Sequence, residues 1–351
     1  MAKKSNIPTK AGLKKGSEGK NVAAVNNYLK ENGYIQSDVL KKAGLRTVIA
    51  QPEPKNPEKF DDNTEKALRL FQQFVGLPET GELDQPTLDK MQQDRCGVAD
   101  MVPELKDGKI PSSYVLSGCK WDTNHLRYAF ENFANDLTQN EVRNAFNMAF
   151  GLWSAVTPLT FSEVGVNDNP EMLIRFGTGN HGGCPFPFQT NTPLAHNFYP
   201  PTCGGGHAGN GHYNESFTWS VDSPPSNIDL VTVAAHEIGH GLGLAHSTVQ
   251  DALMYPYYGG EHRYLHQDDI DGIQAIYGAA EWHHNKKVQR VYTSHHSDNC
   301  WAFIQGIGWR KIKPGTVDGT TNMFIALSAA RATDRPVSVY IENNTIQIMY
   351  L

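Results

Sequence analysis

The sequence predicts three successive domains: a helical domain, a larger domain that mixes strands and helices, and a small domain with the order ββαββ. Its 351 residues exceed the length of one typical domain. Apolar residues recur with the 3.6-residue period of helices near the N-terminus, and strand-like alternation begins only later in the chain. A hydrophobic content of 39% is sufficient for separate buried cores.

The helical domain is expected at residues 20–93, after a basic flexible tail at residues 1–19. A capping box at Asp62–Glu65 would open its second helix. Three prolines between residues 51 and 57 indicate a loop before that helix. Two apolar stripes mark the inward faces of the first two helices: Val22, Val25 and Leu29, then Ala67, Leu70, Phe71 and Phe74.

Residues 94–114 are predicted to form an exposed connector, because Pro103, Gly108 and Pro111 interrupt regular structure there. Such a connector is a natural site of proteolytic cleavage. The mixed domain follows at residues 115–279. Its expected strands are 126–130, 159–164, 172–176, 194–198 and 217–221, and its expected helices begin near residues 138, 229 and 267.

The last 72 residues, 280–351, show a different pattern. Strands are expected at 288–294, 300–312, 337–342 and 345–350, with a helix at 322–331. The adjacent pairs His283–His284 and His295–His296 do not share a face and are interpreted as surface residues. The sequence suggests an accessory binding domain or a structural lid, without naming a ligand.

Composition excludes several classes of function. The net charge of -6 argues against a nucleic-acid partner, and no apolar run approaches the 18 residues of a membrane span. The basic N-terminus has no apolar run behind its charges, so it does not read as a signal peptide. Five cysteines are too few for a disulfide scaffold, and their odd number leaves at least one thiol unpaired.

Residues 236–246 contain three histidines and a glutamate at spacings typical of a catalytic zinc site. His236 and His240 lie one helical turn apart and share a face. Gly243 lets the chain leave the helix, so that His246 can return to the same ion. Three nitrogen ligands leave the fourth tetrahedral position open, and Glu237 is placed to act as general base on a zinc-bound water.

Met254, in the apolar turn Ala252–Pro256, completes a pattern that resembles the matrix metalloproteinases, or matrixins, of the metzincin clan. The resemblance implies an α+β catalytic domain with a twisted mixed sheet and three helices. It also implies a packed Met254 beneath the imidazoles and a substrate bound as an added strand. The residues expected to contact substrate are Leu194, Ala195, Tyr255, Pro256 and Tyr257.

The helical domain resembles the peptidoglycan-binding-like domain that matrixins use as the body of their propeptide. Asp94–Asp100 resembles the cysteine-switch motif, in which the Cys96 thiolate would occupy the open zinc position. Arg95 and Asp100 would pair to hold this loop. Asp94 and Ala99 stand where proline is usual, which argues for a less rigid loop and less secure latency.

A second, structural zinc is implied by His181, His196 and His212, but Gly183 stands where the family has aspartate. Two alternatives remain for Cys184: it replaces that ligand, or it forms a disulfide with Cys203, which is slightly favoured. Calcium dependence is not expected, because non-acidic residues fill the positions where carboxylates are usual: Gln189, Asn210, Asn214 and Phe217.

The leading hypothesis is therefore a secreted, latent zinc metalloendopeptidase that hydrolyses protein substrates and is inhibited by Cys96 until its propeptide is removed. The alternative is a protein that binds cell-wall glycan through its N-terminal domain, with a secondary protease domain. The C-terminal 72 residues are too few for the four-bladed haemopexin propeller that many matrixins carry.

Overall fold

The computed structural model describes residues 7–36, 50–100, 113–188, 193–222, 227–280, 282–293, 300–313, 319–342 and 345–350. The chain forms two compact units. Unit 1 comprises Met1–Trp153 and Leu159–Ile276, and unit 2 comprises Ser154–Pro158 and Tyr277–Leu351. The expected connector at 101–112 and the pair His295–His296 lie outside the described residues. No helix in the described ranges is long and apolar enough to cross a membrane.

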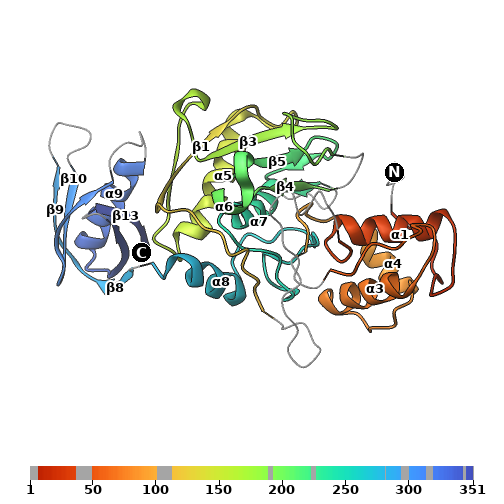
Figure 1. Cartoon of the computed structure of the whole chain (residues 1–351). Helices are drawn as coiled ribbons and strands as arrows, with labels where there is room; N and C mark the ends of the chain where they lie inside the picture. The colour runs from red at the N-terminus through yellow and green to blue at the C-terminus, as the bar shows by residue number, and fades with distance from the viewer. Residues whose placement is uncertain are drawn as a thin grey trace. The chain divides into compact units, whose positions relative to one another are not determined.

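Unit 1 begins with helices α1 (Lys20–Glu31), α3 (Asp62–Phe74) and α4 (Gln85–Met91) (Figure 1). The predicted stripes are confirmed in the main: Val22, Val25 and Leu29 are fully buried, as are Ala67 and Phe71. The N-cap of α3 lies one residue earlier than predicted. The carboxylate of Asp61 accepts hydrogen bonds from the backbone N–H groups of Asn63 and Thr64.

The rest of unit 1 is built on a five-stranded sheet with the order β2-β1-β3-β5-β4. Its strands are β1 (His125–Phe130), β2 (Thr160–Glu163), β3 (Met172–Gly177), β4 (Ala195–Asn197) and β5 (Gly211–Asn214). Only β4 runs antiparallel to its neighbour, and it forms one edge. The short pair β6 (Trp219–Ser220) and β7 (Ile228–Asp229) follows. The predicted strand at 217–221 is therefore much shorter than expected.

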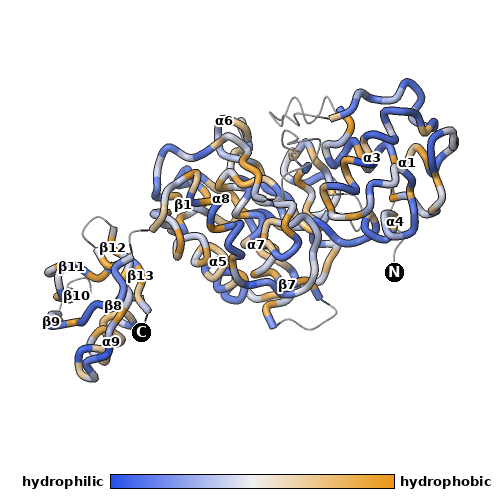
Figure 2. Tube along the Cα trace, turned by 90° about the horizontal axis from the view of Figure 1, so that it is seen from below, coloured by the Kyte–Doolittle hydropathy of each residue, from blue (hydrophilic) through white to orange (hydrophobic). Residues whose placement is uncertain are grey.

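Three helices complete this part: α5 (Gln139–Ser154), α7 (Leu230–Gly241) and α8 (Gln267–Tyr277); α6 (Pro201–Gly204) is a single turn. A capping box opens α5, because the Glu141 carboxylate accepts from the Thr138 N–H and the Thr138 hydroxyl accepts from the Glu141 N–H. The indole of Trp153 on α5 donates to the Ala235 carbonyl on α7. Hydrophobic residues recur along α5 and α7 (Figure 2). These contacts hold α7 firmly in the core.

The cysteines do not pair as favoured from the sequence. Cys119 and Cys203 form a disulfide, and Cys96, Cys184 and Cys300 are free and buried. Residue spacing carries no information on which distant segments meet in the fold, so it could not reveal that Cys119, 84 positions earlier, lies beside Cys203. The Cys184–Cys203 disulfide is therefore wrong.

The described residues of unit 2 form a six-stranded sheet with the order β8-β12-β13-β11-β10-β9 and the helix α9 (Gly319–Ala332) (Figure 1). The strands are β8 (Trp282–Lys286), β9 (Val288–Thr293), β10 (Cys300–Ile304), β11 (Gly308–Ile312), β12 (Val337–Glu342) and β13 (Thr345–Tyr350). The expected ββαββ order is not confirmed, because β8 is additional and residues 300–312 form two strands. Gly306 and Gly308, both at positive φ, make the turn that divides them.

Candidate active site

Helix α7 carries the first two histidines of the motif on a fully buried turn. Its N-cap, Asp229, accepts from the Thr232 N–H at 3.0 Å and pairs with Arg263. His236 and His240 lie one turn apart, and their Nε2 atoms are 3.1 Å from each other. Gly243, at φ +109°, then ends the helical path; a Cβ there would lie 2.2 Å from the Cys119 carbonyl oxygen. The chain returns through His246.

Each of the three imidazoles is oriented by an acceptor at Nδ1. His236 faces the Leu253 carbonyl, His240 the Leu244 carbonyl and His246 the Asp100 carboxylate, each at 2.7 Å. Because these oxygens can only accept, every Nδ1 carries the proton and every Nε2 keeps its lone pair. The Nε2 of His246 is buried with no hydrogen-bond partner among the described residues. The rings are thus prepared for a ligand at Nε2.

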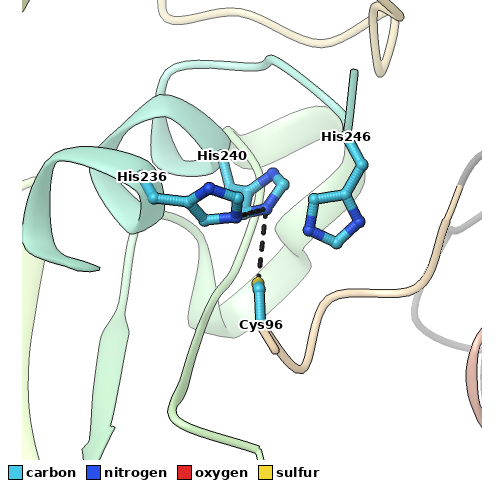
Figure 3. A group of neighbouring side chains, drawn as sticks. All are labelled: Cys96, His236, His240 and His246. Atoms are coloured by element: carbon cyan, nitrogen blue, oxygen red, sulfur yellow. Dashed lines mark hydrogen bonds between the residues drawn. The ribbon is translucent and has the colours of Figure 1, made fainter. Parts of the chain in front are cut away.

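Cys96 closes this group from the opposite side (Figure 3). Its Sγ lies 3.5 Å from His240 Nε2, and the ligand atoms of Cys96, His236, His240 and His246 all lie within 4.8 Å of one another. A tetrahedral zinc would separate two nitrogens by roughly 3.3 Å and a nitrogen from a sulfur by roughly 3.6 Å. The spacing and the donor set of three imidazoles and one thiol therefore fit zinc.

Glu237 lies beside this group, fully buried on the same turn of α7. Neither of its carboxylate oxygens has a hydrogen-bond partner among the described residues. Burial raises the pKa of Glu237 to about 8. A carboxyl with a pKa near neutrality can both take and return a proton at neutral pH.

Met254 packs against α7 at Gly239. A Cβ on Gly239 would lie 2.4 Å from the Met254 sulfur, so only glycine fits there. The Asp269 carboxylate accepts from the N–H groups of Leu253 and Met254 at 2.8 and 3.0 Å. This buried carboxylate fixes the turn that also supplies the acceptor for His236.

Comparison with known proteins agrees with this geometry. Residues 120–278 match the family model described as Matrixin, and residues 18–91 match one described as Putative peptidoglycan binding domain. The chain contains a domain of the matrixin family. The matrixin domain thus contains the whole histidine motif, and Cys96 lies between the two matched segments.

Curated relatives cover different parts of the chain. An interstitial collagenase of Sus scrofa is 38% identical over 271 residues, which are 76% of this chain and 51% of that protein. Karilysin of Tannerella forsythia is 46% identical over 168 residues, 48% of this chain and 35% of that protein. Matrix metalloproteinase-C of Caenorhabditis elegans is 40% identical over 227 residues, which are 61% of this chain and 37% of that protein. The chain spans about half the length of these relatives or less.

The segment that carries Cys96 lies across the matrixin domain and is hydrogen-bonded on both sides. On one side, the Leu194 N–H donates to the Arg95 carbonyl and the Gly97 N–H to the Ala195 carbonyl, at 3.0 and 2.8 Å. On the other side, the Cys96 N–H donates to the Pro256 carbonyl at 3.0 Å. These partners include three of the five residues predicted to contact substrate.

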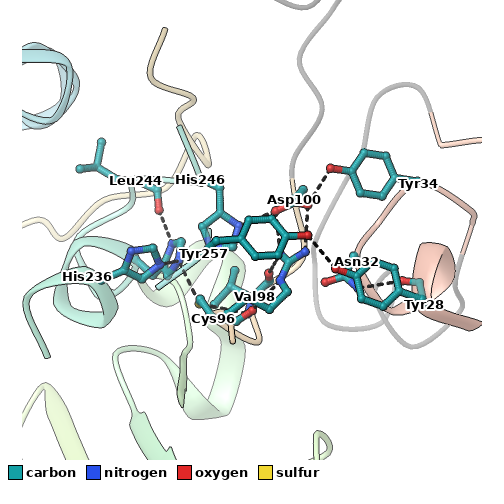
Figure 4. Close-up of polar contacts among 12 residues, drawn as sticks. Tyr28, Asn32, Tyr34, Cys96, Val98, Asp100, His236, Leu244, His246 and Tyr257 are labelled. Carbon is teal, nitrogen blue, oxygen red and sulfur yellow. Dashed lines mark hydrogen bonds and ion pairs between the residues drawn. The ribbon is translucent and has the colours of Figure 1, made fainter. Parts of the chain in front are cut away.

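The Asp100 carboxylate connects the segment that carries Cys96 both to the helical domain and to the metal-ligand histidines (Figure 4). It forms a buried ion pair with Arg95 at 2.8 Å, accepts from the Tyr34 hydroxyl at 2.7 Å, and faces His246. Burial opposes its charge, yet Arg95 and His246 lower the pKa of Asp100 to about 2. Tyr28 adds a hydroxyl contact of 2.7 Å with Tyr257. The helical domain thus contributes two tyrosines to the site.

A pocket of about 250 Å³ lies next to Cys96. His236 and Glu237 line it, together with residues 250–253 and 255–262. Tyr255, Pro256 and Tyr257, predicted to wall a substrate pocket, all line it. Leu194 lines the pocket as well.

The second histidine group contains a thiol. His181 Nε2 and His196 Nε2 lie 3.1 and 3.0 Å from His212 Nδ1, and Cys184 Sγ lies 3.3 Å from His196 Nε2. All four residues are buried, and their ligand atoms lie within 4.8 Å of one another. Burial lowers the pKa of His212 to about 3, so its ring is neutral at physiological pH. The group has the composition of a closed zinc site.

The sequence indicates Asp100 only as the partner of Arg95; the contacts of Asp100 with His246 and Tyr34, and that of Tyr28 with Tyr257, appear only in the structure. No sequence signal marks them, because His246 lies 146 positions from Asp100. Gly239 could have been noticed in the sequence. Glycine inside a helix costs about 1 kcal/mol relative to alanine, so its presence there indicates a close approach by another group.

Proposed function

We propose that this chain is a latent zinc metalloendopeptidase that cleaves protein substrates outside the cell. The proposed organisation is a basic tail at 1–19, a pro-domain at 20–93, a switch loop and activation connector at 94–114, a catalytic domain at 115–279 and an accessory domain at 280–351. The observation that carries the proposal is the meeting of three Nε2 atoms, the unpartnered Glu237 carboxylate and the Cys96 thiol at one point.

In this proposal His236, His240 and His246 hold the catalytic zinc, and Glu237 is the general base. When bound, zinc lowers the pKa of a coordinated water towards neutrality and polarises the scissile carbonyl. Glu237 takes the proton of the attacking water and delivers it to the leaving amine. Leu194 and Ala195 on the β4 edge, with Tyr255, Pro256 and Tyr257 opposite, hold the substrate extended.

Latency follows from occupation of the same positions by residues 94–97. The Cys96 thiol fills the fourth ligand position, and its backbone takes the hydrogen bonds proposed for substrate. Removal of the pro-domain would free the fourth ligand position. It would also free the backbone groups of Leu194 and Ala195 on one side and of Pro256 on the other. In this state the Asp94 carbonyl accepts from the Tyr258 N–H at 3.0 Å, and Ala99 is buried.

The first test uses the uncut chain. Cys96→Ser should cleave a peptide library without processing, because a serine hydroxyl is a far weaker zinc ligand than a thiolate. Wild type should be at least a hundredfold slower. Cys96→Ser with Glu237→Ala is the matched control; it should bind zinc, measured by metal analysis, and remain inactive. A zinc-loaded, folded Cys96→Ser protein without peptidase activity would contradict both latency and function.

A second zinc, held by His181, Cys184, His196 and His212, is part of the proposal. The buried thiol in this group supports Cys184 as the replacement for the missing aspartate. Calcium dependence stays unexpected. The Asn214 side chain accepts from the Ser216 N–H and donates to the Pro193 carbonyl, so it is engaged within the chain.

The alternative function is binding of cell-wall glycan through the N-terminal domain, which the match to the peptidoglycan-binding family favours. The pro-domain uses Tyr28 and Tyr34 against the catalytic site, which favours the pro-domain role. A pull-down on peptidoglycan separates the two. Retention of the whole chain, lost when residues 1–95 are deleted, would support glycan binding.

A further inference from the structure

One face of the unit 2 sheet carries aromatic and basic side chains that its core does not use. On β10, Cys300, Ala302 and Ile304 are buried in the core that includes Leu327 and Ala330 of α9. Side chains alternate between the two faces of a strand. Trp301 and Phe303 therefore project to the face opposite α9.

The strand register extends this face over β9 and β11. Trp301 lies opposite Tyr292 on β9 and Lys311 on β11. Phe303 lies opposite Arg290 on β9 and Trp309 on β11, and the rings of Phe303 and Trp309 are 5.5 Å apart. We call this set the aromatic–basic face: Arg290, Tyr292, Trp301, Phe303, Trp309 and Lys311.

The face is open to solvent at its margins. Tyr292 is 52% exposed and Trp309 38% exposed. On the other half of the sheet, the Trp282 ring contacts the rings of Tyr340 and Tyr350, and the Trp282 indole donates to the Ala155 carbonyl of the same unit. Clustered exposed aromatic rings mark binding surfaces more often than chance packing.

We propose that the aromatic–basic face binds an anionic polysaccharide. Flat aromatic rings stack on the apolar C–H faces of sugar rings, while Arg290 and Lys311 pair with carboxylate or sulfate groups. Residues 277–351 contain eight Lys and Arg but five Asp and Glu, whereas the whole chain is acidic at -6. Unit 2 therefore attracts polyanions that the rest of the chain repels.

The spacing of the cations selects the class of polyanion. Arg290 and Lys311 lie on the two strands that flank β10. Arg290 is level with Phe303 and Lys311 with Trp301, two residues along β10, so strand spacing separates their backbones by roughly 12 Å. Nucleic acid carries a phosphate on every nucleotide and requires a denser row of cations. A polysaccharide with one acidic group on every second sugar has widely spaced charges. That spacing suits a face with two cations among four aromatic rings.

The experiment measures binding of the whole chain to hyaluronan, which has one carboxylate for every two sugars, by affinity electrophoresis and tryptophan fluorescence. Neutral dextran and single-stranded oligo(dT) are the comparison polymers. Wild type should bind hyaluronan, bind dextran at least tenfold more weakly, and lose affinity as salt rises. Failure to bind hyaluronan, or tighter binding to oligo(dT), would overturn the proposal.

Variants locate the site. Tyr292→Ala with Trp309→Ala should weaken hyaluronan binding at least tenfold, and Trp309→Phe should retain it. Arg290→Gln with Lys311→Gln should reduce the salt dependence. Ile325→Ala is the control, because Ile325 is an exposed apolar residue of α9, 60% exposed, outside the face. Equal loss in the control, with circular dichroism unchanged, would contradict this location.

Discussion

At the scale of residues, Asp100 couples the pro-segment to the metal-ligand set. Its carboxylate is fully buried and serves Arg95, Tyr34 and His246 together. A carboxylate behind a ligating histidine fixes the tautomer and strengthens the imidazole as a donor. The segment from Asp94 to Asp100 would therefore contribute to the site in two ways: the Cys96 thiol acts directly, and the Asp100 carboxylate acts through His246.

Asp100→Asn should loosen latency in the uncut chain. The change keeps the size of the side chain but leaves Arg95 without its buried counter-charge, which typically costs roughly 3–5 kcal/mol. We expect at least tenfold faster peptide cleavage than uncut wild type, and zinc affinity lowered about tenfold in competition with a chelating indicator. Asp89→Asn, at an exposed position of α4, is the control. Unchanged values for both measurements would show that Asp100 acts on neither.

At the scale of elements, the second histidine group is assembled from a loop and two paired strands. His196 on β4 and His212 on β5 are register partners, and residues 181–184 bring the other two ligands. Register partners share one face of the sheet. The sheet thus supplies two ligand positions that sequence spacing alone could not relate.

Cys184→Ser should remove one bound metal ion and leave the catalytic one. Metal analysis after a chelator wash should give two zinc ions for wild type and one for the variant, because a serine hydroxyl replaces zinc's thiolate ligand. Cys300→Ser is the control, since Cys300 is also buried and free but lies in the core of unit 2. Two tightly held ions in Cys184→Ser would exclude the thiol as a ligand.

Sequence patterns predicted elements where periodicity was uninterrupted. Helix α8 begins at the predicted residue, and β12 and β13 match the predicted ranges. Periodicity did not divide residues 300–312 into β10 and β11, because the alternation of apolar residues continues from one strand of this hairpin into the next. It also could not locate the Cys119–Cys203 disulfide or the Asp100–His246 contact, because neither depends on local spacing.

At the scale of the whole molecule, both histidine groups belong to unit 1, and the described residues of unit 2 contain no comparable group. Each unit has its own hydrophobic core. A ligand that binds only the folded form of one unit stabilises that unit alone. Metal should therefore affect the stability of the two units differently.

Calorimetry of the whole chain should separate them. Zinc at a hundred times its dissociation constant adds about 2.7 kcal/mol per site, which corresponds to roughly 5–10 °C in the melting temperature of a unit of this size. A chelator should lower the transition of unit 1 by at least that amount and leave the transition of unit 2 in place. Cys184→Ser should show part of this decrease before chelation. A parallel decrease in both transitions would mean that the units unfold together, or that unit 2 binds metal through residues outside the described ranges.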